Sequence, residues 1–384
     1  MKLLHFGDIH IGMENYSKMD PRTGLSTRLL DFFATFDWIV ETAIAQKVDV
    51  VVFAGDAYKT RDPNPTQQRG FSQRIKQLSK AGIPTVLVVG NHDTPNAEGK
   101  ANSLDIYSAL EIDNVWVSRV PELLKVPTKS GSLQVVTLPW LHKNDYKTIG
   151  EKLRLLYDQI EKGSPAILLS HCEVEGAAYG SEKGLAIAND VTIPLPLLQD
   201  KRLSYAALGH IHKHQVLSQN PLVVYAGSPQ RIDFGEEAED KGICLVETND
   251  KNQASFEFIP SNARKFLTIT VNLKPDDKLP TQTILGEILK NEIVDKIVRI
   301  LINIPAECEG EIEIDKIKKA LSGAHVIAGI SRNLEKRHRT QIDGVEEVES
   351  LSPIQALGKY FESKNYSKEK VKELESFAAQ ILES

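Results

Sequence analysis

The stretch VDVVVFAGDAY, residues 48–58, passes directly from β-branched apolar residues to Gly55 and Asp56. A short apolar run that stops abruptly at polar residues is typical of a buried strand. The same pattern recurs four times, in KLLHF (2–6) before GDIH, IPTVLVV (83–89) before GNHD, PAILLS (165–170) before HCE, and LSYAALG (203–209) before HIHKH. We therefore expect a set of buried strands, each ending in polar side chains.

Helical patterns separate the early strands. Residues 29–46 and 66–82 carry apolar residues at helical spacing, and Gly82 is a suitable stop for the second helix. Strand, helix and strand in alternation predict an α/β core. In open α/β sheets a ligand binds beyond the carboxyl ends of the strands, where each polar cluster falls here.

The pattern changes near residue 262. Residues 266–331 read as strand, helix, strand, helix and strand, which we interpret as a separate α+β cap domain. Further on, Ser352 with Pro353, and then Ser367, are good starts for two amphipathic helices. We expect a first domain over 1–262, a cap domain over 263–341, and C-terminal helices over 350–384.

Composition excludes several classes of protein. The 384 residues are 41% hydrophobic, which is typical of globular domains, and the net charge of −6 gives no general attraction to nucleic acid. The three cysteines lie far apart, which argues against a disulfide framework or a structural zinc site. The chain starts without a signal-peptide pattern and lacks a run of ~18 apolar residues, so we expect a cytoplasmic protein.

Nitrogen and oxygen donors end the predicted strands: Asp8, His10, Asp56, Asn91, His171, His210 and His212. A mixture of imidazole, carboxylate and amide suits manganese, iron or zinc at partly open sites. The set is too large for a single ion. We expect it to divide between two ions, with Asp56 as the bridge, Asp8, His10 and His212 on one ion, and Asn91, His171 and His210 on the other.

Together these residues spell the ordered motifs D-x-H (8–10), G-D (55–56), G-N-H-D (90–93), H (171) and G-H-x-H (209–212). The chain thereby resembles the calcineurin-like metallophosphoesterase superfamily. GDIHIG (7–12), LPWLH (138–142), YAGSPQRIDFGE (225–236) and KGICLVE (241–247) are similar to the SbcD nuclease family, the bacterial counterpart of the meiotic-recombination-eleven repair nucleases.

This resemblance implies a β-sandwich flanked by helices, then a cap domain and C-terminal helices that bind an ATPase partner. It implies a nuclease with two manganese ions that trims double-stranded DNA ends exonucleolytically and cuts single strands or hairpins. His92 is implied as a catalytic residue. We expect it to protonate the departing sugar oxygen or to stabilise the charged transition state, with Asp93 orienting its ring. Alternatives remain open: a phosphatase or nucleotide phosphodiesterase on the same metal core, or a scaffold that only tethers DNA ends.

DNA contacts are predicted from basic residues near the motifs and at the end of the cap domain. Relatives resemble one another in having a histidine three positions after the bridging aspartate, whereas this chain has Lys59. The full predicted set is Lys59, Arg61, Arg69, Arg332, Lys336, Arg337 and Arg339.

The partners are predicted partly from a missing motif. The chain contains no P-loop signature, so a partner has to supply any ATPase activity. The resemblance implies an SbcC-like coiled-coil ATPase that binds the C-terminal helices. It also implies a homodimer within a heterotetramer, for which Leu104, Ile106 and Tyr107 are candidate contact residues.

Overall fold

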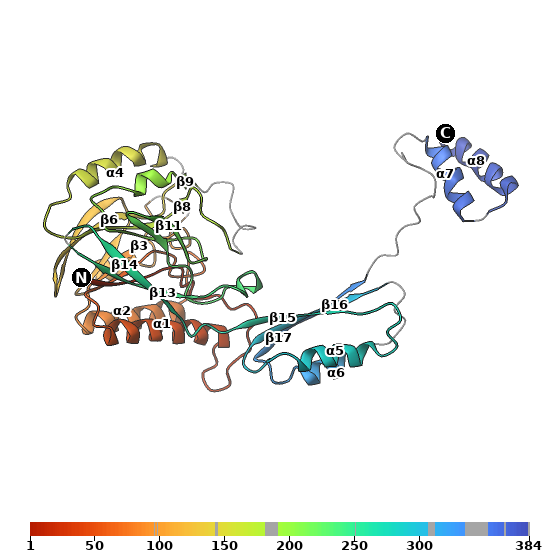
Figure 1. Cartoon of the computed structure of the whole chain (residues 1–384), viewed down its shortest axis with the longest axis horizontal. Coiled ribbons are helices and arrows are strands. Elements are labelled where there is room, and N and C mark those ends of the chain that lie inside the picture. Colours follow the sequence, from red (N-terminus) through yellow and green to blue (C-terminus); the bar gives the residue numbers. More distant parts are fainter. Residues whose placement is uncertain are drawn as a thin grey trace.

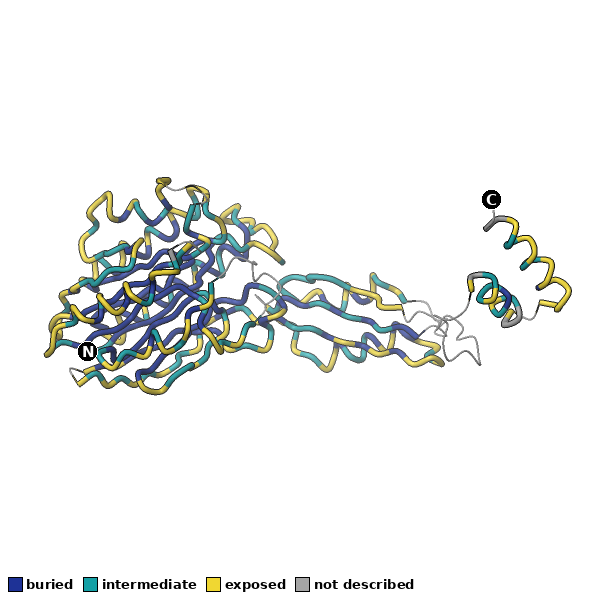
Figure 2. The backbone as a smooth tube through the Cα atoms, turned by 90° about the horizontal axis from the view of Figure 1, so that it is seen from above, coloured by how far each residue is buried: buried dark blue, intermediate teal, exposed yellow. Residues whose placement is uncertain are grey.

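A computed structural model describes residues 1–95, 97, 99–142, 145–180, 191–249, 251–305, 312–334, 352–364 and 366–382. Its main body is a sandwich of two six-stranded sheets with helices on both outer faces (Figure 1). Buried residues concentrate in the strands of this sandwich (Figure 2). The predicted α/β fold with flanking helices is therefore confirmed.

The first sheet contains the strands of the first three motifs. Its order is β14 (Ala254–Pro260), β13 (Gly242–Thr248), β1 (Lys2–Phe6), β2 (Val50–Phe53), β3 (Thr85–Val88) and β4 (Val115–Ser118). Strands β1 to β4 are parallel, while β13 and β14 are antiparallel neighbours. The carboxyl ends of β1, β2 and β3 therefore lie at one edge of the sheet.

The second sheet contains the two histidine motifs. Its order is β11 (Gln215–Gln219), β12 (Leu222–Tyr225), β10 (Tyr205–Gly209), β7 (Ala166–His171), β6 (Gly131–Leu138) and β5 (Glu122–Thr128). Its central strands β6, β7, β10 and β12 are parallel. The remaining short elements of the body are η1 (Asp145–Thr148), β8 (Glu173–Val174), β9 (Thr192–Ile193), η3 (Leu195–Leu198) and η4 (Phe234–Glu236).

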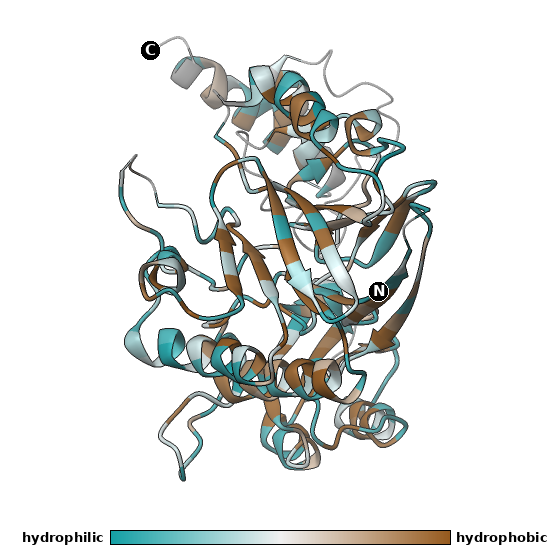
Figure 3. Cartoon of the chain, turned by 90° about the vertical axis from the view of Figure 1, so that its left-hand side faces the viewer, coloured by the Kyte–Doolittle hydropathy of each residue, from teal (hydrophilic) through white to brown (hydrophobic). Residues whose placement is uncertain are grey.

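The continuous apolar runs are explained by burial on both faces of each strand. In β2, Val50 and Val52 pack between the two sheets, whereas Val51 and Phe53 pack against the helices outside. The first sheet is covered by α1 (Thr27–Ala45), α2 (Pro65–Lys80) and α3 (Asp105–Ala109), and the second by α4 (Ile149–Asp158). The strands are mainly hydrophobic and the covering helices mixed, as Figure 3 shows. A nearly continuous hydrophobic sequence is typical of parallel strands that are buried on both faces.

The predicted ends of α2 are explained by its caps. Asn64 accepts a hydrogen bond from the N–H of Gln67, and the Gln67 side chain accepts from the N–H of Asn64, with Pro65 at the first position. Gly82 follows with a φ of 67°, a conformation that favours glycine and ends the helix.

The unit after residue 262 is a three-stranded sheet with two helices. Its elements are β15 (Phe266–Asn272), α5 (Pro280–Leu289), β16 (Ile297–Ile304), α6 (Ile314–Ala320) and β17 (Val326–Leu334). All three strands are parallel, so the α+β prediction for this unit is wrong: each helix is a crossover between neighbouring parallel strands. The helices lie on one face of the sheet (Figure 1), as successive crossovers of the same hand require.

A small aromatic cluster joins this unit to the sandwich. Phe234 of η4 contacts Tyr16 and Phe266 edge to face. Next to it, Glu237 accepts hydrogen bonds from the backbone N–H and the hydroxyl of Thr268 in β15. The segment around η4 therefore connects the three-stranded sheet to the sandwich.

Two helices end the described chain, α7 (Pro353–Ser363) and α8 (Lys368–Leu382). The hydroxyls of Ser352 and Ser367 accept hydrogen bonds from the third residue of each helix, as predicted for capping residues. The helices pack against each other, with Val371 buried, and Figure 1 shows the pair apart from the rest of the molecule. Among the described residues, no helix combines the length and apolar character that a membrane span requires.

The position of the loop after β3 depends on Gly90. A Cβ atom at Gly90 would lie 2.1 Å from Oδ1 and 2.4 Å from the backbone nitrogen of Asp56. We expect Gly90→Ala to lower the free energy of unfolding by about 1–3 kcal/mol, because the loop after β2 has to move. Urea unfolding measures this change. As a control, Gly150→Ala in α4 meets no atom closer than 3.6 Å and should not destabilise the chain; equal unfolding curves for both variants would contradict the expectation.

Candidate metal centre

The two sheets bring the predicted ligands together at one edge of the sandwich. Asp8 and His10 follow β1, Asp56 follows β2, and Asn91 follows β3. From the second sheet, His171 ends β7 and His210 follows β10. Residues separated by more than 200 positions in the sequence are thereby in direct contact, for example the N–H of His210 with both oxygens of Asp8, at 3.0 and 3.1 Å.

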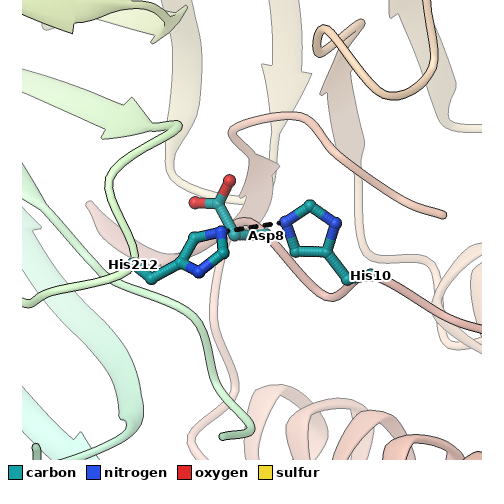
Figure 4. Close-up of side chains that lie close together, drawn as sticks. All are labelled: Asp8, His10 and His212. Atoms are coloured by element: carbon teal, nitrogen blue, oxygen red, sulfur yellow. Dashed lines mark hydrogen bonds between the residues drawn. The ribbon is translucent and has the colours of Figure 1, made fainter. Parts of the chain in front are cut away.

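The first ligand group is Asp8, His10 and His212. The Nε2 atoms of His10 and His212 are 3.0 Å apart, and the close-up in Figure 4 shows all three side chains pointing toward one another. One donor atom of each residue lies within 4.8 Å of the others. This group is the set that the sequence predicts for one ion.

The second group converges on Asn91. Its Oδ1 lies 2.8 Å from His171 Nε2 and 3.2 Å from His210 Nδ1. Asp56 lies between the groups, with its Oδ2 at 3.6 Å from His10 Nε2 and 3.5 Å from His171 Nε2. Asp56 thus faces both groups, while Asp8 also lies close enough to Asp56 and His171 to share an ion with them, so the division into two groups stays a prediction.

Hydrogen bonds leave lone pairs pointing into the centre. The Ala54 carbonyl is 2.7 Å from His171 Nδ1 and can only accept, so Nδ1 carries a proton, and the ring offers a lone pair at Nε2 when it is neutral. Burial opposes protonation of this ring, but Asp56 and Asp8 raise the pKa of His171 above its ordinary value, so a metal ion at Nε2 competes with a proton. In the neutral ring, His171 Nε2 and Asn91 Oδ1 are two acceptors that face each other at 2.8 Å. A cation between such groups would satisfy both.

Burial also affects the protonation states of the candidate ligands. Burial lowers the pKa of His210 to about 3 and the pKa of His10 well below 6.5, so both rings are neutral at physiological pH. Burial opposes ionisation of Asp56, but nearby histidines, His171 first among them, hold its pKa below its usual range. His10, His210 and Asp56 are thus in the protonation states that metal binding requires. Burial raises the pKa of Asp8 to about 6, and the pKa of His171 is also raised, so metal binding at these two residues competes with protons. The donor set fits two divalent ions.

Four of the predicted ligands adopt a left-handed backbone. The φ angles are 51° for Asp8, 44° for His10, 57° for Asp56 and 98° for His210. Each such residue costs about 1–3 kcal/mol, and strain of this kind concentrates at functional sites. The strained turns direct the side chains into the space between the strand ends.

His92 lies at the edge of the centre, and Asp93 lies beneath it. The His92 ring is exposed, contacts the His10 ring at 5.0 Å between centroids, and its Nδ1 is 2.7 Å from the Lys59 carbonyl. The fully buried Asp93 carboxylate instead accepts from the backbone N–H groups of Asp56, Ala57 and Gly90. The prediction that Asp93 orients the His92 ring is therefore wrong: Asp93 holds the loops of two ligands.

The predicted DNA-contacting residues are scattered. Lys59 is half-buried in the loop after β2, Arg61 donates from Nε to the Thr94 carbonyl at 2.6 Å, and Arg69 is exposed on α2. Arg332 is exposed on β17 and pairs in register with Ile302, whose side chain packs under α5 and α6, so Arg332 lies on the helix-bearing face of that sheet. Lys336, Arg337 and Arg339 lie outside the described residues.

Glu236 is a residue at the site that the sequence analysis missed. It is fully buried, and its Oε1 lies 2.8 Å from His212 Nδ1 while its Oε2 lies 2.8 Å from Lys241 Nζ. Because a carboxylate only accepts, His212 Nδ1 donates and its Nε2 presents a lone pair to the centre. Glu236 ends the YAGSPQRIDFGE stretch, and a buried glutamate within that resemblance was the available signal.

Glu236→Gln is expected to weaken metal binding about 10–100-fold, because the amide no longer fixes the His212 tautomer by charge. Isothermal titration calorimetry of the metal-free chain with Mn²⁺ measures the affinity of the chain for the metal. Glu239→Gln is the matched control: Glu239 also contacts Lys241 Nζ, at 2.8 Å, and it belongs to neither ligand group. Equal affinities of the two variants would show that Glu236 does not act through His212.

The two groups of histidine and carboxylate ligands lie at the strand ends of a β-sandwich. This arrangement is typical of metal-dependent hydrolases. The model of the family "Calcineurin-like phosphoesterase" matches residues 1–214, more than half of the chain. The chain belongs to the calcineurin-like phosphoesterase family, and it is accordingly a phosphodiesterase that works with two divalent metal ions.

Relatives extend the similarity. The SbcD component of the nuclease SbcCD from Escherichia coli is 27% identical over 282 residues, 67% of each chain. DNA double-strand break repair protein Mre11 of Sulfurisphaera tokodaii is 27% identical over 279 residues, 71% of this chain and 65% of that protein. The protein of the same name from Archaeoglobus fulgidus is 25% identical over 366 residues, 91% of this chain and 76% of its own length. The chain thus spans about two thirds of the first two relatives.

Proposed function

We propose that the chain is an SbcD-like DNA nuclease that trims double-stranded ends exonucleolytically and cuts single strands or hairpins during double-strand-break repair. The observation that carries the proposal is the complete ligand set at the strand ends, in a chain whose relatives are named as nucleases and DNA-break repair proteins. DNA as substrate also suits a chain with a second unit and C-terminal helices, which a small-molecule phosphatase does not require.

In this proposal Asp8, His10 and His212 hold one ion and Asn91, His171 and His210 the other, with Asp56 between them. The mixture of imidazole, carboxylate and amide donors suits Mn²⁺. When bound, the two ions activate water and neutralise charge on the phosphate. Asp93 keeps the ligand loops in register through its three backbone hydrogen bonds.

His92 supplies the proton for the leaving group. In the protonated ring, Nδ1 donates to the Lys59 carbonyl and Nε2–H is left to donate to the departing sugar oxygen. Ring exposure at the edge of the centre supports this role, because a DNA strand has to reach it. Lys59, Arg61 and Arg69 contribute positive charge around the same loop.

The partner proposals follow from the remaining parts of the chain. The proposed chain has three parts: a nuclease domain over 1–262, a DNA-recognising cap domain over 263–341 and ATPase-binding helices over 350–384. This organisation suits a complex with an SbcC-like coiled-coil ATPase. The complex would act on chromosomal DNA in the cytoplasm. Exposed Ile106 and Leu110 support a homodimer contact; Leu104 and Tyr107 are buried in the chain's own core and cannot contribute.

Cleavage of end-labelled linear duplex and hairpin DNA with Mn²⁺ tests the proposal, with and without the ATPase partner and ATP. A phosphomonoester substrate runs in parallel. We expect DNA products and little phosphomonoester turnover. Phosphomonoester turnover with intact DNA would instead identify a phosphatase, and no turnover of either substrate with the complete complex would leave a tethering role.

A further inference from the structure

A pocket of about 390 Å³ opens beside the metal centre, beyond the carboxyl ends of β3, β4 and β6. We call it the Trp140 pocket; its walls include Val89, Pro95, Pro121, Trp140 and Leu141. Its volume is in the range of ~300–1,000 Å³ that is usual for sites of small ligands. It contains none of the predicted metal ligands, so the metal centre does not account for it.

The pocket adjoins the metal centre across Trp140 and Leu141. Trp140 and Leu141 also line a smaller cleft that contains His171 and His210. On the other side, the backbone N–H of Trp140 donates to the Val89 carbonyl at 2.9 Å, and Val89 is two residues before Asn91. A DNA strand whose phosphate lies at the ligands would therefore have the Trp140 pocket next to it.

The walls of the pocket combine apolar, polar and basic side chains. Lys100, Arg119, Lys152 and His142 line the pocket, and its described lining includes no carboxylate. Arg119 is held by Asp105 at 2.9 Å, whereas neither Lys100 nor Lys152 forms an ion pair with a carboxylate in the described part of the chain. Apolar walls that include Trp140, together with cationic side chains, are suited to a base and its phosphate, since every base has a π-face that can stack.

We propose that the Trp140 pocket binds one unpaired nucleotide of the DNA strand, next to the phosphodiester at the metal centre. The base lies against Trp140, and its phosphate is neutralised by Lys100 and Lys152. A base can enter only if it is not paired, and unpairing costs least at mismatched or single-stranded positions. The inference rests on the proposed nuclease function and gives it a substrate preference: frayed ends are cut faster than blunt ones.

The test compares kcat/KM for duplexes with a mismatched end, blunt duplexes and methyl p-nitrophenyl phosphate, which has no second phosphate to reach the lysines. Trp140→Leu should lower kcat/KM on mismatched ends about tenfold relative to the small diester and remove the preference over blunt ends. A Lys100→Ala/Lys152→Ala double variant should lower the same ratio. Lys162→Ala, an exposed lysine outside the pocket, should keep the wild-type ratio.

The proposal would be overturned if the double variant kept the wild-type ratio of kcat/KM on mismatched ends to kcat/KM on the small diester. An equal loss of kcat/KM on all three substrates would overturn it as well. If Trp140→Leu does not fold, the result with the Lys100→Ala/Lys152→Ala variant tests the proposal by itself. If the wild type hydrolyses the small diester but cuts no DNA, the proposed nuclease function fails. The pocket is then judged by the anisotropy of a labelled hexanucleotide: about tenfold weaker binding by the double variant supports it, and equal binding overturns it.

Discussion

Asp56→Asn is expected to lower phosphodiester turnover by at least about a thousandfold and to leave fewer than two metal ions per chain. Asp56 Oδ2 lies 3.6 Å from His10 Nε2 and 3.5 Å from His171 Nε2, so the carboxylate faces both ligand groups. An amide keeps the shape but lacks the negative charge that two neighbouring cations need. Loss of the several kcal/mol that a metal ion supplies to the transition state corresponds to this factor.

Metal content by mass spectrometry and turnover of the small diester measure this effect. Asp315→Asn is the control, since Asp315 is fully exposed on α6 and far from the ligands in sequence and fold. Circular dichroism checks that Asp56→Asn folds. A folded Asp56→Asn chain with two ions and wild-type turnover would show that Asp56 does not bridge the two groups.

His92→Gln is expected to lower kcat by about 10²–10⁴-fold while the chain still binds two metal ions. The reason is that glutamine cannot deliver a proton to the leaving oxygen, although it can still hydrogen-bond to the Lys59 carbonyl. This separates two possible roles, because the side chains of His10, Asp56 and His92 also lie close enough together to hold a cation. A proton donor affects the rate, whereas a ligand affects metal content.

Substrates with different leaving groups sharpen the measurement. A p-nitrophenyl leaving group needs little protonation, so His92→Gln should lose less activity on methyl p-nitrophenyl phosphate than on DNA. Equal losses on both substrates, or loss of one metal ion, would argue against the proton-donor role.

Much of the candidate site could be predicted because local sequence patterns encode it. Buried parallel strands need continuous apolar runs, and their carboxyl ends must meet at one edge, so the polar residues after β1, β2 and β3 are brought together by the sheet itself. The helices between them were recognisable from spacing and caps. The division of the ligands around Asp56 needed only their number and chemistry.

The two wrong predictions concern the direction in which the Asp93 side chain points and the pairing of strands that lie far apart in the sequence. Asp93 is adjacent to His92 in sequence, yet its carboxylate turns inward to three backbone N–H groups, one of them on its own loop and two after β2. For the unit after residue 262, the order of helices and strands was right, but order alone does not distinguish parallel crossovers from a mixed arrangement.

The sequence by itself determined the strands, the helices and the candidate metal ligands, because these depend on periodicity and residue chemistry within a few positions. The tertiary structure alone decided that Glu236 contacts His212 and that Asp8, His10, Asp56 and His210 adopt left-handed turns. It also decided that Trp140 lines both the Trp140 pocket and a small cleft shared with His171 and His210. These features depend on contacts between segments far apart in the chain, and such contacts exist only once the two sheets have packed together.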